Sequence, residues 1–437
     1  MRSYFLLSLA ALPLFGPATT SISALAAPLT FEESVALAVQ HSAALRNARA
    51  SVTAAEQRAS AAYSGFFPQV SGDVTYVDRS GSSLPTVTST TAYSTSVTVT
   101  QNLFAGYQDQ ARIEQAAANV DVAQAALASA KAQLSRDLKF AFAGLAYAQD
   151  NVVLTDDILR RLEENLRLVE LRFEGGRENK GSLLLSQASV AQGRFEQLQA
   201  RQALSSAQAQ LATVLGLTAP MGGTKGTSVP DYTVPDLRAV GTVSLAIPVA
   251  APDFAALVRG APDRRDAIAR ERSAGADVRL ARAGFYPSVN VSGSVGRDGS
   301  AWFPNESSRV FSANVSIPFF SGGRDYYGER GALSALDAVK ANRESVEGQV
   351  LVRLKQTYAA YVESVEQLNV ARGFLTAAQT RATIARARYE NGLISFEDWD
   401  RIESELIQRR KALLQSQRDR VNAEAAWELA QGTGVIP

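Results

Sequence analysis

The chain has 437 residues, and its 44 Lys and Arg residues nearly balance 43 Asp and Glu residues, giving a formal net charge of +1. It contains no cysteine and a single histidine, His41. This composition excludes a disulfide framework, a thiolate site and a lipidated N-terminal cysteine, and it argues against histidine chemistry and multi-histidine metal sites. Binding to nucleic acid is not expected, since it needs a concentrated basic surface. We therefore expect no enzymatic activity, no metal and no cofactor.

Residues 1–26 have the pattern of a secretory signal peptide. Arg2 supplies the positive charge, residues 5–12 form an apolar core, and Ala24-Leu25-Ala26 is a small-x-small cleavage site. No later run of about 18 apolar residues predicts a transmembrane helix. The sequence therefore indicates an exported protein, either periplasmic or of the β-type membrane class.

Alternating apolar and polar residues predict two β-hairpins, one in each half of the chain. The expected strands span about 69–79, 93–104, 287–297 and 309–320. The segments 78–92 and 297–308 are rich in Gly, Ser, Thr and Pro, which favours loops between the paired strands. An Ala-rich helix is predicted before the first strand, over 42–63, and Pro68 prevents its continuation.

Each predicted hairpin is followed by a stretch without proline that predicts a very long helix. Residues 107–173 would form a helix about 100 Å long. Its apolar residues repeat every seven positions, with a four-residue stutter between Leu134 and Leu145, as in a coiled coil that straightens partway along. A matching long helix is expected over 324–390. Return helices are expected over 182–215 and 397–431.

The chain repeats itself with an offset of 216 residues. The sequence Arg172-Phe173-Glu174-Gly175-Gly176 aligns with Arg388-Tyr389-Glu390-Asn391-Gly392. We therefore predict a mainly α chain with some β structure, built from a duplicated unit of helix, β-hairpin and long helical hairpin. The first repeat spans 27–216 and the second spans 253–437. Between them, 217–252 is rich in proline and predicts an irregular connector.

Four strands per chain cannot close a β-barrel, for which about eight is the practical minimum. Either the strands form an ordinary soluble sheet, or several chains contribute to one barrel, three copies giving 12 strands. Aromatic residues at the strand ends suit a membrane interface. These residues are Phe66, Phe67, Phe104, Phe285, Tyr286, Phe319 and Phe320.

The order and double occurrence of these motifs resemble the TolC family of outer-membrane efflux proteins. The resemblance covers nearly all of the predicted mature chain. It includes the strand entries Gly65-Phe66-Phe67-Pro68 and Gly284-Phe285-Tyr286-Pro287 and the glycine turns after the long helices. It implies a homotrimer with a 12-stranded barrel in the outer membrane and an α-helical barrel extending into the periplasm. Such a channel passes small molecules or proteins outward, together with a periplasmic adaptor and an inner-membrane pump of the RND or ABC type.

The resemblance also implies where the functional residues lie. The turns at Gly175, Gly176, Asn391, Gly392 and Leu393 would form the periplasmic tip and contact the adaptor. A simpler interpretation of the glycines is that they permit the left-handed conformation of a turn between antiparallel helices.

The same resemblance implies a gate that includes Tyr389 and Asp398. Tyr389 matches an aromatic residue that holds the family's tip shut, while Asp398 matches one position of an acidic ring. Asp398 could equally cap the return helix. The second acidic position is Arg401, and the positions of the usual partner groups are Gly181, Ser182 and Ile394. A different lock is therefore expected.

Two other functions compete with the outer-membrane channel. A soluble periplasmic coiled-coil adaptor or scaffold would also contain long helical hairpins beside β structure, although the duplication of the whole unit argues against it. An exported hydrolase would need a nucleophile and base, and the sequence offers no such arrangement. The sequence does not identify the exported substrate or the type of pump.

Overall fold

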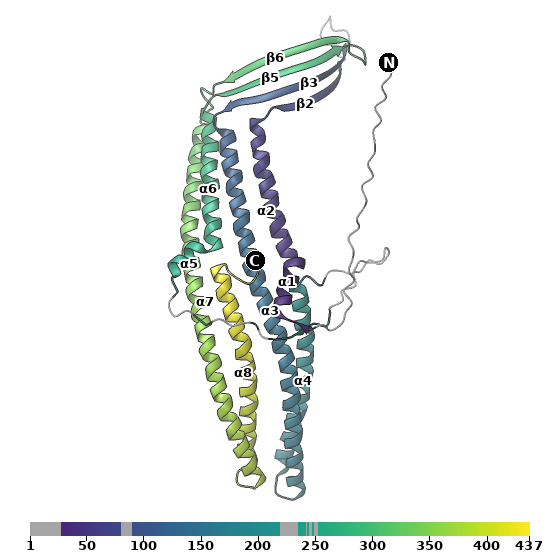
Figure 1. Cartoon of the computed structure of the whole chain (residues 1–437), viewed down its shortest axis with the longest axis vertical. Coiled ribbons are helices and arrows are strands. Elements are labelled where there is room, and N and C mark those ends of the chain that lie inside the picture. Colours follow the sequence, from purple (N-terminus) through teal and green to yellow (C-terminus); the bar gives the residue numbers. More distant parts are fainter. Residues whose placement is uncertain (1–27, 80–89, 219–234, 242, 244–246, 249–251) are drawn as a thin grey trace.

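The computed structural model describes residues 28–79, 90–218, 235–241, 243, 247–248 and 252–437. These residues form a long helical rod with a β-sheet at one end and, at the other, two turns that connect antiparallel helices (Figure 1). The predicted signal peptide, 1–26, and much of the predicted connector, 217–252, lie outside the described residues.

Two very long helices run the length of the rod and each turns back into a shorter partner (Figure 1). The helices are α1 (Phe31–His41), α2 (Ala43–Ala62), α3 (Gln108–Glu174), α4 (Lys180–Val214), α5 (Phe254–Gly260), α6 (Pro262–Arg282), α7 (Arg324–Glu390) and α8 (Phe396–Gln431). Helices α3 and α7 each have 67 residues. We call α3–α4 the first helical hairpin and α7–α8 the second. In the described part of the chain, no helix combines the length and apolar character needed to cross a membrane.

The sheet at the end of the rod is antiparallel and has the order β2-β3-β5-β6. Its strands are β2 (Gln69–Arg79), β3 (Thr90–Ala105), β5 (Ser288–Gly299) and β6 (Glu306–Ser316). A separate parallel pair joins β1 (Pro28–Leu29) to β4 (Arg238–Ala239).

The strand boundaries differ from the predicted ones at three places. The fourth strand was expected to reach residue 320 but ends at Ser316, because Pro318 has no N–H group to donate to the ladder. Parts of both predicted loops belong to strands instead. Thr90 pairs with Arg79, and Glu306 pairs with Asp298. The β-branched residues Thr90 and Thr91 suit an extended backbone despite the polar composition that favoured a loop.

The register of the strands separates an apolar face from a polar face. On one face the pairs Val70–Val99, Val97–Val295 and Val289–Val315 lie opposite each other. The other face carries pairs such as Ser71–Thr98 and Asn290–Asn314. Val70, Val97, Val295 and Val315 are all more than half exposed in the single chain. The sheet therefore presents one uncovered apolar surface and one uncovered polar surface.

The upper part of α3 packs through alanine. Ala111, Ala118, Ala125 and Ala132 recur every seven residues and are nearly fully buried. The predicted heptad series through Val120 and Leu127 lies two residues further along, and those two side chains are only half-buried in the single chain. Small side chains let α2 and α6 approach α3 closely, so the innermost positions are occupied by alanine rather than by the larger residues.

Candidate gate at the helical tips

Both helical hairpins turn in the same way, and glycine is what permits it. Gly176 has φ +69° and Gly392 has φ +72°, in the left-handed region of backbone conformation that residues with a Cβ atom rarely adopt. The Gly176 N–H donates to the carbonyl of Phe173 at 2.9 Å, and the Gly392 N–H donates to that of Tyr389 at 2.9 Å. All five residues predicted to form the tip, including Gly175, Asn391 and Leu393, are exposed.

Tyr389, the predicted gate aromatic, is completely buried where the two helical hairpins meet. Its ring stacks on Trp399 of α8, with ring centroids 4.3 Å apart and planes inclined by 8°. Phe396 meets both rings edge-on. Val169 of α3 completes this cluster from the first hairpin. The second hairpin thus contributes stacked aromatic rings to a cluster that includes Val169 of the first hairpin.

Two charged residues of the first hairpin contact Tyr389. The Arg172 guanidinium carbon lies 4.5 Å from the centroid of the Tyr389 ring, and Arg172 Nη1 donates to the Tyr389 carbonyl at 2.7 Å. The Tyr389 hydroxyl donates to Glu178 Oε2 at 2.8 Å. The Glu178 side chain is only 9% exposed, and it lies 3.9 Å from Arg172 Nε. We call Arg172, Glu178, Tyr389 and Trp399 the tip lock.

The electrostatics of the tip lock favour a protonated tyrosine. Burial and the hydrogen bond to Glu178 raise the pKa of Tyr389 well above its usual value of 10.0. The hydroxyl therefore remains a hydrogen-bond donor throughout the neutral and mildly alkaline range. The phenol cannot lose this proton without placing two negative groups side by side in a buried site.

Of the tip lock, sequence reasoning singled out Tyr389 alone as a gate residue. The family resemblance gives Gly181, Ser182 and Ile394 as the partner positions, and neither Arg172 nor Glu178 is among them. The 216-residue offset aligns Glu178 of the first repeat with Ile394 of the second, so a carboxylate in one repeat corresponds to an apolar residue in the other. A comparison of the two turns position by position could have drawn attention to Glu178.

Asp398 lies at the start of α8, away from the buried aromatic cluster. Ser395 caps this helix: its hydroxyl accepts from the Asp398 N–H and donates to the Asp398 carboxylate, both at 3.1 Å. The Asp398 carboxylate also pairs with Arg401, and its side chain is 52% exposed. Asp398 therefore supports the helix cap made by Ser395 while keeping an exposed carboxylate with a local counter-charge.

Three further ion pairs join α3 to α8, at two levels between the tip and the middle of the rod. Arg161 donates to both oxygens of Glu403, through Nε at 2.6 Å and Nη2 at 2.9 Å. Lys139 Nζ lies 3.2 Å from Glu424 Oε1 and 2.7 Å from Glu428 Oε1. The side chains of Lys139, Glu403 and Glu424 are almost fully buried. The two helical hairpins are thus fastened to each other at three levels.

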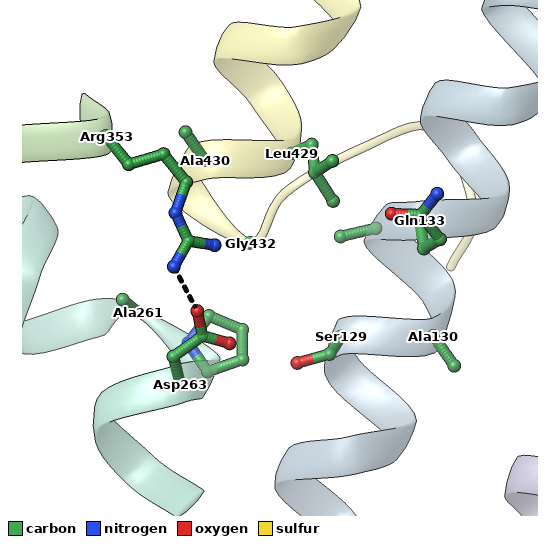
Figure 2. A pocket seen from close by; sticks show the side chains of 11 residues that line it. Ser129, Ala130, Gln133, Ala261, Asp263, Arg353, Leu429, Ala430 and Gly432 are labelled. Atoms are coloured by element: carbon green, nitrogen blue, oxygen red, sulfur yellow. Dashed lines mark ion pairs between the residues drawn. The ribbon is translucent and has the colours of Figure 1, made fainter. Parts of the chain in front are cut away.

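Two open cavities border this contact between the helical hairpins. One, of about 420 Å³, lies near the tip lock and is lined by Asn165, Trp399 and Asp400, among others. Burial, with a smaller contribution from Glu403, raises the pKa of the Asp400 carboxyl. The other, of about 340 Å³, lies at mid-height, where Arg353 pairs with Asp263 at 2.8 Å (Figure 2). Among the described residues no cluster of side chains could hold a metal ion.

The predicted membrane-interface aromatics gather where the rod meets the sheet. Six of them are exposed, and Phe104 is half-buried. Phe104 packs edge-on against Tyr107 at 5.3 Å, and Tyr107 packs against Tyr286 at 5.7 Å. Phe319 and Phe320 lie beyond the end of β6 and are about 90% exposed. An exposed aromatic belt therefore borders one edge of the apolar face.

The model of the outer membrane efflux protein family matches residues 35–217 and 256–433, one match in each half. The solvent efflux pump outer membrane protein SrpC of Pseudomonas putida is 26% identical over 288 residues, which are 64% of this chain and 58% of that relative. The match thus spans less than two thirds of the relative's length. The toluene efflux pump outer membrane protein TtgI of the same species matches to the same extent.

Solved structures share the fold at low sequence identity. CusC, whose crystal structures concern folding and transmembrane channel formation, superposes with a TM-score of 0.79 over 92% of both chains at 20% identity. The outer membrane protein VceC of Vibrio cholerae superposes with a TM-score of 0.75 at 20% identity, over 92% of this chain and 96% of that one. The resemblance inferred from the motifs is confirmed, and the matching family is one of efflux proteins rather than of enzymes.

Proposed function

The chain belongs to the outer membrane efflux protein family, and from this premise we propose that it is the outer-membrane duct of an export machine. Three copies form one 12-stranded barrel through the outer membrane and one helical tube that extends into the periplasm. A periplasmic adaptor protein and an inner-membrane pump complete the machine.

The observation that carries this proposal is the two-faced, open sheet. Strands β2 and β6 are its edges, and their outer backbone groups have no partner strand among the described residues of one chain. Since neighbouring strands alternate in direction, β6 of one copy can pair antiparallel with β2 of the next. Closure of three sheets leaves no edge, turns the valine face toward lipid and lines the duct with serine, threonine and asparagine.

The tip lock supports the assignment of the opposite end as a gate. Tyr389 and Trp399 hold the second helical hairpin against Arg172 and Glu178 of the first, which keeps the tube narrow. The adaptor acts on the exposed turns at Gly175, Gly176, Asn391, Gly392 and Leu393 and shifts one hairpin against the other. Three Asp398 carboxylates, each partly balanced by Arg401, form a ring at the entrance that favours cations.

Two measurements test the proposal. The mature protein should be found in outer-membrane fractions as trimers that dissociate on heating, and it should conduct ions in planar bilayers. A monomer confined to the soluble periplasmic fraction would instead support the adaptor or scaffold function. The names of the two relatives, solvent and toluene efflux proteins, favour small molecules over proteins as the first cargo to test. Cells that lack the protein should then accumulate more of such a compound.

A further inference from the structure

The apolar face of the sheet carries two arginines near the loop that joins β5 to β6. Val295 pairs directly with Arg309, and Arg297 pairs with Ser307. Since residues two apart on a strand share a face, both arginines lie on the side of Val295. They are diagonal neighbours, a placement that separates residues by about 7–8 Å. Both side chains are exposed.

No described residue neutralises these two charges, since neither arginine forms an ion pair in the described part of the chain. Asp298 and Glu306 pair with each other across the two strands and therefore lie on the polar face. Asp78 shares the apolar face but belongs to β2, two strands away from β5. Residues 80–89 contain no Asp or Glu. Two neighbouring like charges therefore lack a counter-charge in the part of the chain that the structure describes.

The distance of the two arginines from the aromatic belt matches the height of the apolar band of an outer-membrane barrel. Eleven positions separate Arg297 from Tyr286 of the aromatic belt, and ten separate Arg309 from Phe319. At about 3.3 Å per residue and a strand tilt of about 40°, both arginines lie roughly 25–28 Å above the belt. The apolar band of an outer-membrane barrel is about 25 Å tall, so the arginines fall at its far boundary.

A second group of aromatic residues marks the same boundary. Tyr76 and Tyr93 lie on the apolar face with ring centroids 5.0 Å apart, and Trp302 meets Tyr93 edge-on at 5.5 Å. Trp302 is 71% exposed and the adjacent Phe303 is 84% exposed. Tyrosine and tryptophan are enriched at the level of lipid headgroups, where cationic side chains are also tolerated.

We infer that Arg297 and Arg309 bind the phosphorylated headgroup of a lipid in the outer leaflet. This inference rests on the proposed function, which turns the apolar face toward lipid. Guanidinium groups bind phosphate through paired hydrogen bonds, and two of them match the charge of a phosphomonoester better than that of one carboxylate. The ligand is a lipid rather than free phosphate, because Val295 beside Arg309 and Phe311 below it continue the same face and contact acyl chains.

The test uses the full mature protein in nanodiscs of phosphatidylcholine, with bis-phosphorylated lipid A added as the probe and bound lipid counted by native mass spectrometry. The wild type should bind lipid A about tenfold more tightly than chemically dephosphorylated lipid A. The double variant Arg297→Gln/Arg309→Gln should lose most of this difference. The matched control is Arg46→Gln/Arg58→Gln, which removes the same charge from two exposed positions on α2 and should keep the difference.

Several results would overturn the inference. A double variant that keeps its preference for phosphorylated lipid would do so, as would effective competition by millimolar inorganic phosphate. If the arginines instead pair with Asp78 of a neighbouring copy, then Asp78→Asn should destabilise the trimer as much as the arginine variant does, with or without lipid A. Failure of the wild type to enter nanodiscs or outer membranes would count against the proposed function itself. Normal insertion without a phosphate preference would count against this inference alone.

Discussion

The two helical tips share one turn geometry but differ in the side chains that flank it. The 216-residue offset pairs Phe173 with Tyr389, Glu178 with Ile394, Leu183 with Trp399, and Leu184 with Asp400. Tyr389 is fully buried, whereas Phe173 is 37% exposed. The second tip provides flat aromatic surfaces, and the first provides Arg172 and Glu178, which hold them.

This difference shows what the duplication makes possible. Two identical tips would bring aromatic to aromatic or carboxylate to carboxylate. Because the repeats have diverged, the two tips of one chain are complementary. The charged residues of the first helical hairpin contact the aromatic residues of the second. Replacing an aromatic residue of the second tip with its counterpart from the first should therefore reduce local stability far more than a matched substitution in the first tip.

The largest effect is expected from Trp399→Leu, which places the first tip's residue in the second tip. The change removes the stacked partner of Tyr389 and leaves a cavity, which should cost about 2–4 kcal/mol of local stability. Hydrogen exchange of the backbone amides around 385–403 measures this loss directly, and bilayer conductance should rise. The control is Phe173→Leu, a similar truncation at an exposed position, which should leave both quantities nearly unchanged.

A smaller effect is expected from Tyr389→Phe, which removes only the hydroxyl that donates to Glu178. A buried hydrogen bond to a charged group contributes about 2 kcal/mol, so protection from hydrogen exchange should fall by that amount. The reverse change, Phe173→Tyr, adds a hydroxyl where it is solvated and should have no effect. Equal effects of the two changes would show that the hydroxyl contact is not specific to the second tip.

This hydrogen bond also has a predictable pH dependence. The pKa of Tyr389 is raised in the folded protein, so its contribution to stability is complete below the unfolded value of 10.0. It is lost as pH rises toward the higher folded value. Tip protection in the wild type should therefore fall above about pH 10, more steeply than in Tyr389→Phe.

Asp400→Asn should raise stability slightly at neutral pH. Burial, followed by repulsion from Glu403, raises the pKa of Asp400. Because the folded value exceeds the unfolded one, ionisation at neutral pH opposes folding, and stability rises as pH falls through the folded pKa. Asparagine removes this charge, and because the group is partly exposed, the gain should not exceed about 0.5 kcal/mol. Thermal unfolding at pH 7 and pH 5 measures it; a loss of stability would contradict the sign.

The smallest effect on stability is expected from Asp398→Asn, because the carboxylate is exposed and Ser395 still caps the helix. Its effect should appear in ion selectivity instead. Asp398→Asn should reduce the cation preference of the channel modestly, whereas Arg401→Gln should increase it by removing the local counter-charge. Reversal potentials in a salt gradient distinguish these outcomes, and no change in either variant would remove Asp398 from the gate.

Much of the fold could be predicted because it is periodic. Alternation over β2 and β5, heptads along α3 and the repeated glycine turns are all local patterns that one sequence displays. The strand end at Ser316 could also have been predicted, since Pro318 is a plain stop signal. The alternation of apolar and polar residues, however, continues through Ile317 and Phe319 and favours a longer strand.

The tip lock could be predicted only in part. The motif resemblance selects Tyr389, but its charged partners, Arg172 and Glu178, lie more than 200 residues away in the chain. No local pattern relates Arg172 or Glu178 to that tyrosine, because the contact exists only once the two helical hairpins lie together. For the same reason, no local pattern in the sequence predicts the buried ion pair between Arg161 and Glu403.

The length of α3 turns small rotations into useful displacements. From Lys139, where buried ion pairs fix the middle of the rod, 35 residues lead to Glu174. At 1.5 Å per residue this is a stiff arm of about 52 Å. A pivot of about 5° at its base would swing the far end by about 4–5 Å, so in the proposed duct the opening between the tips would widen while the packing around the pivot hardly changes.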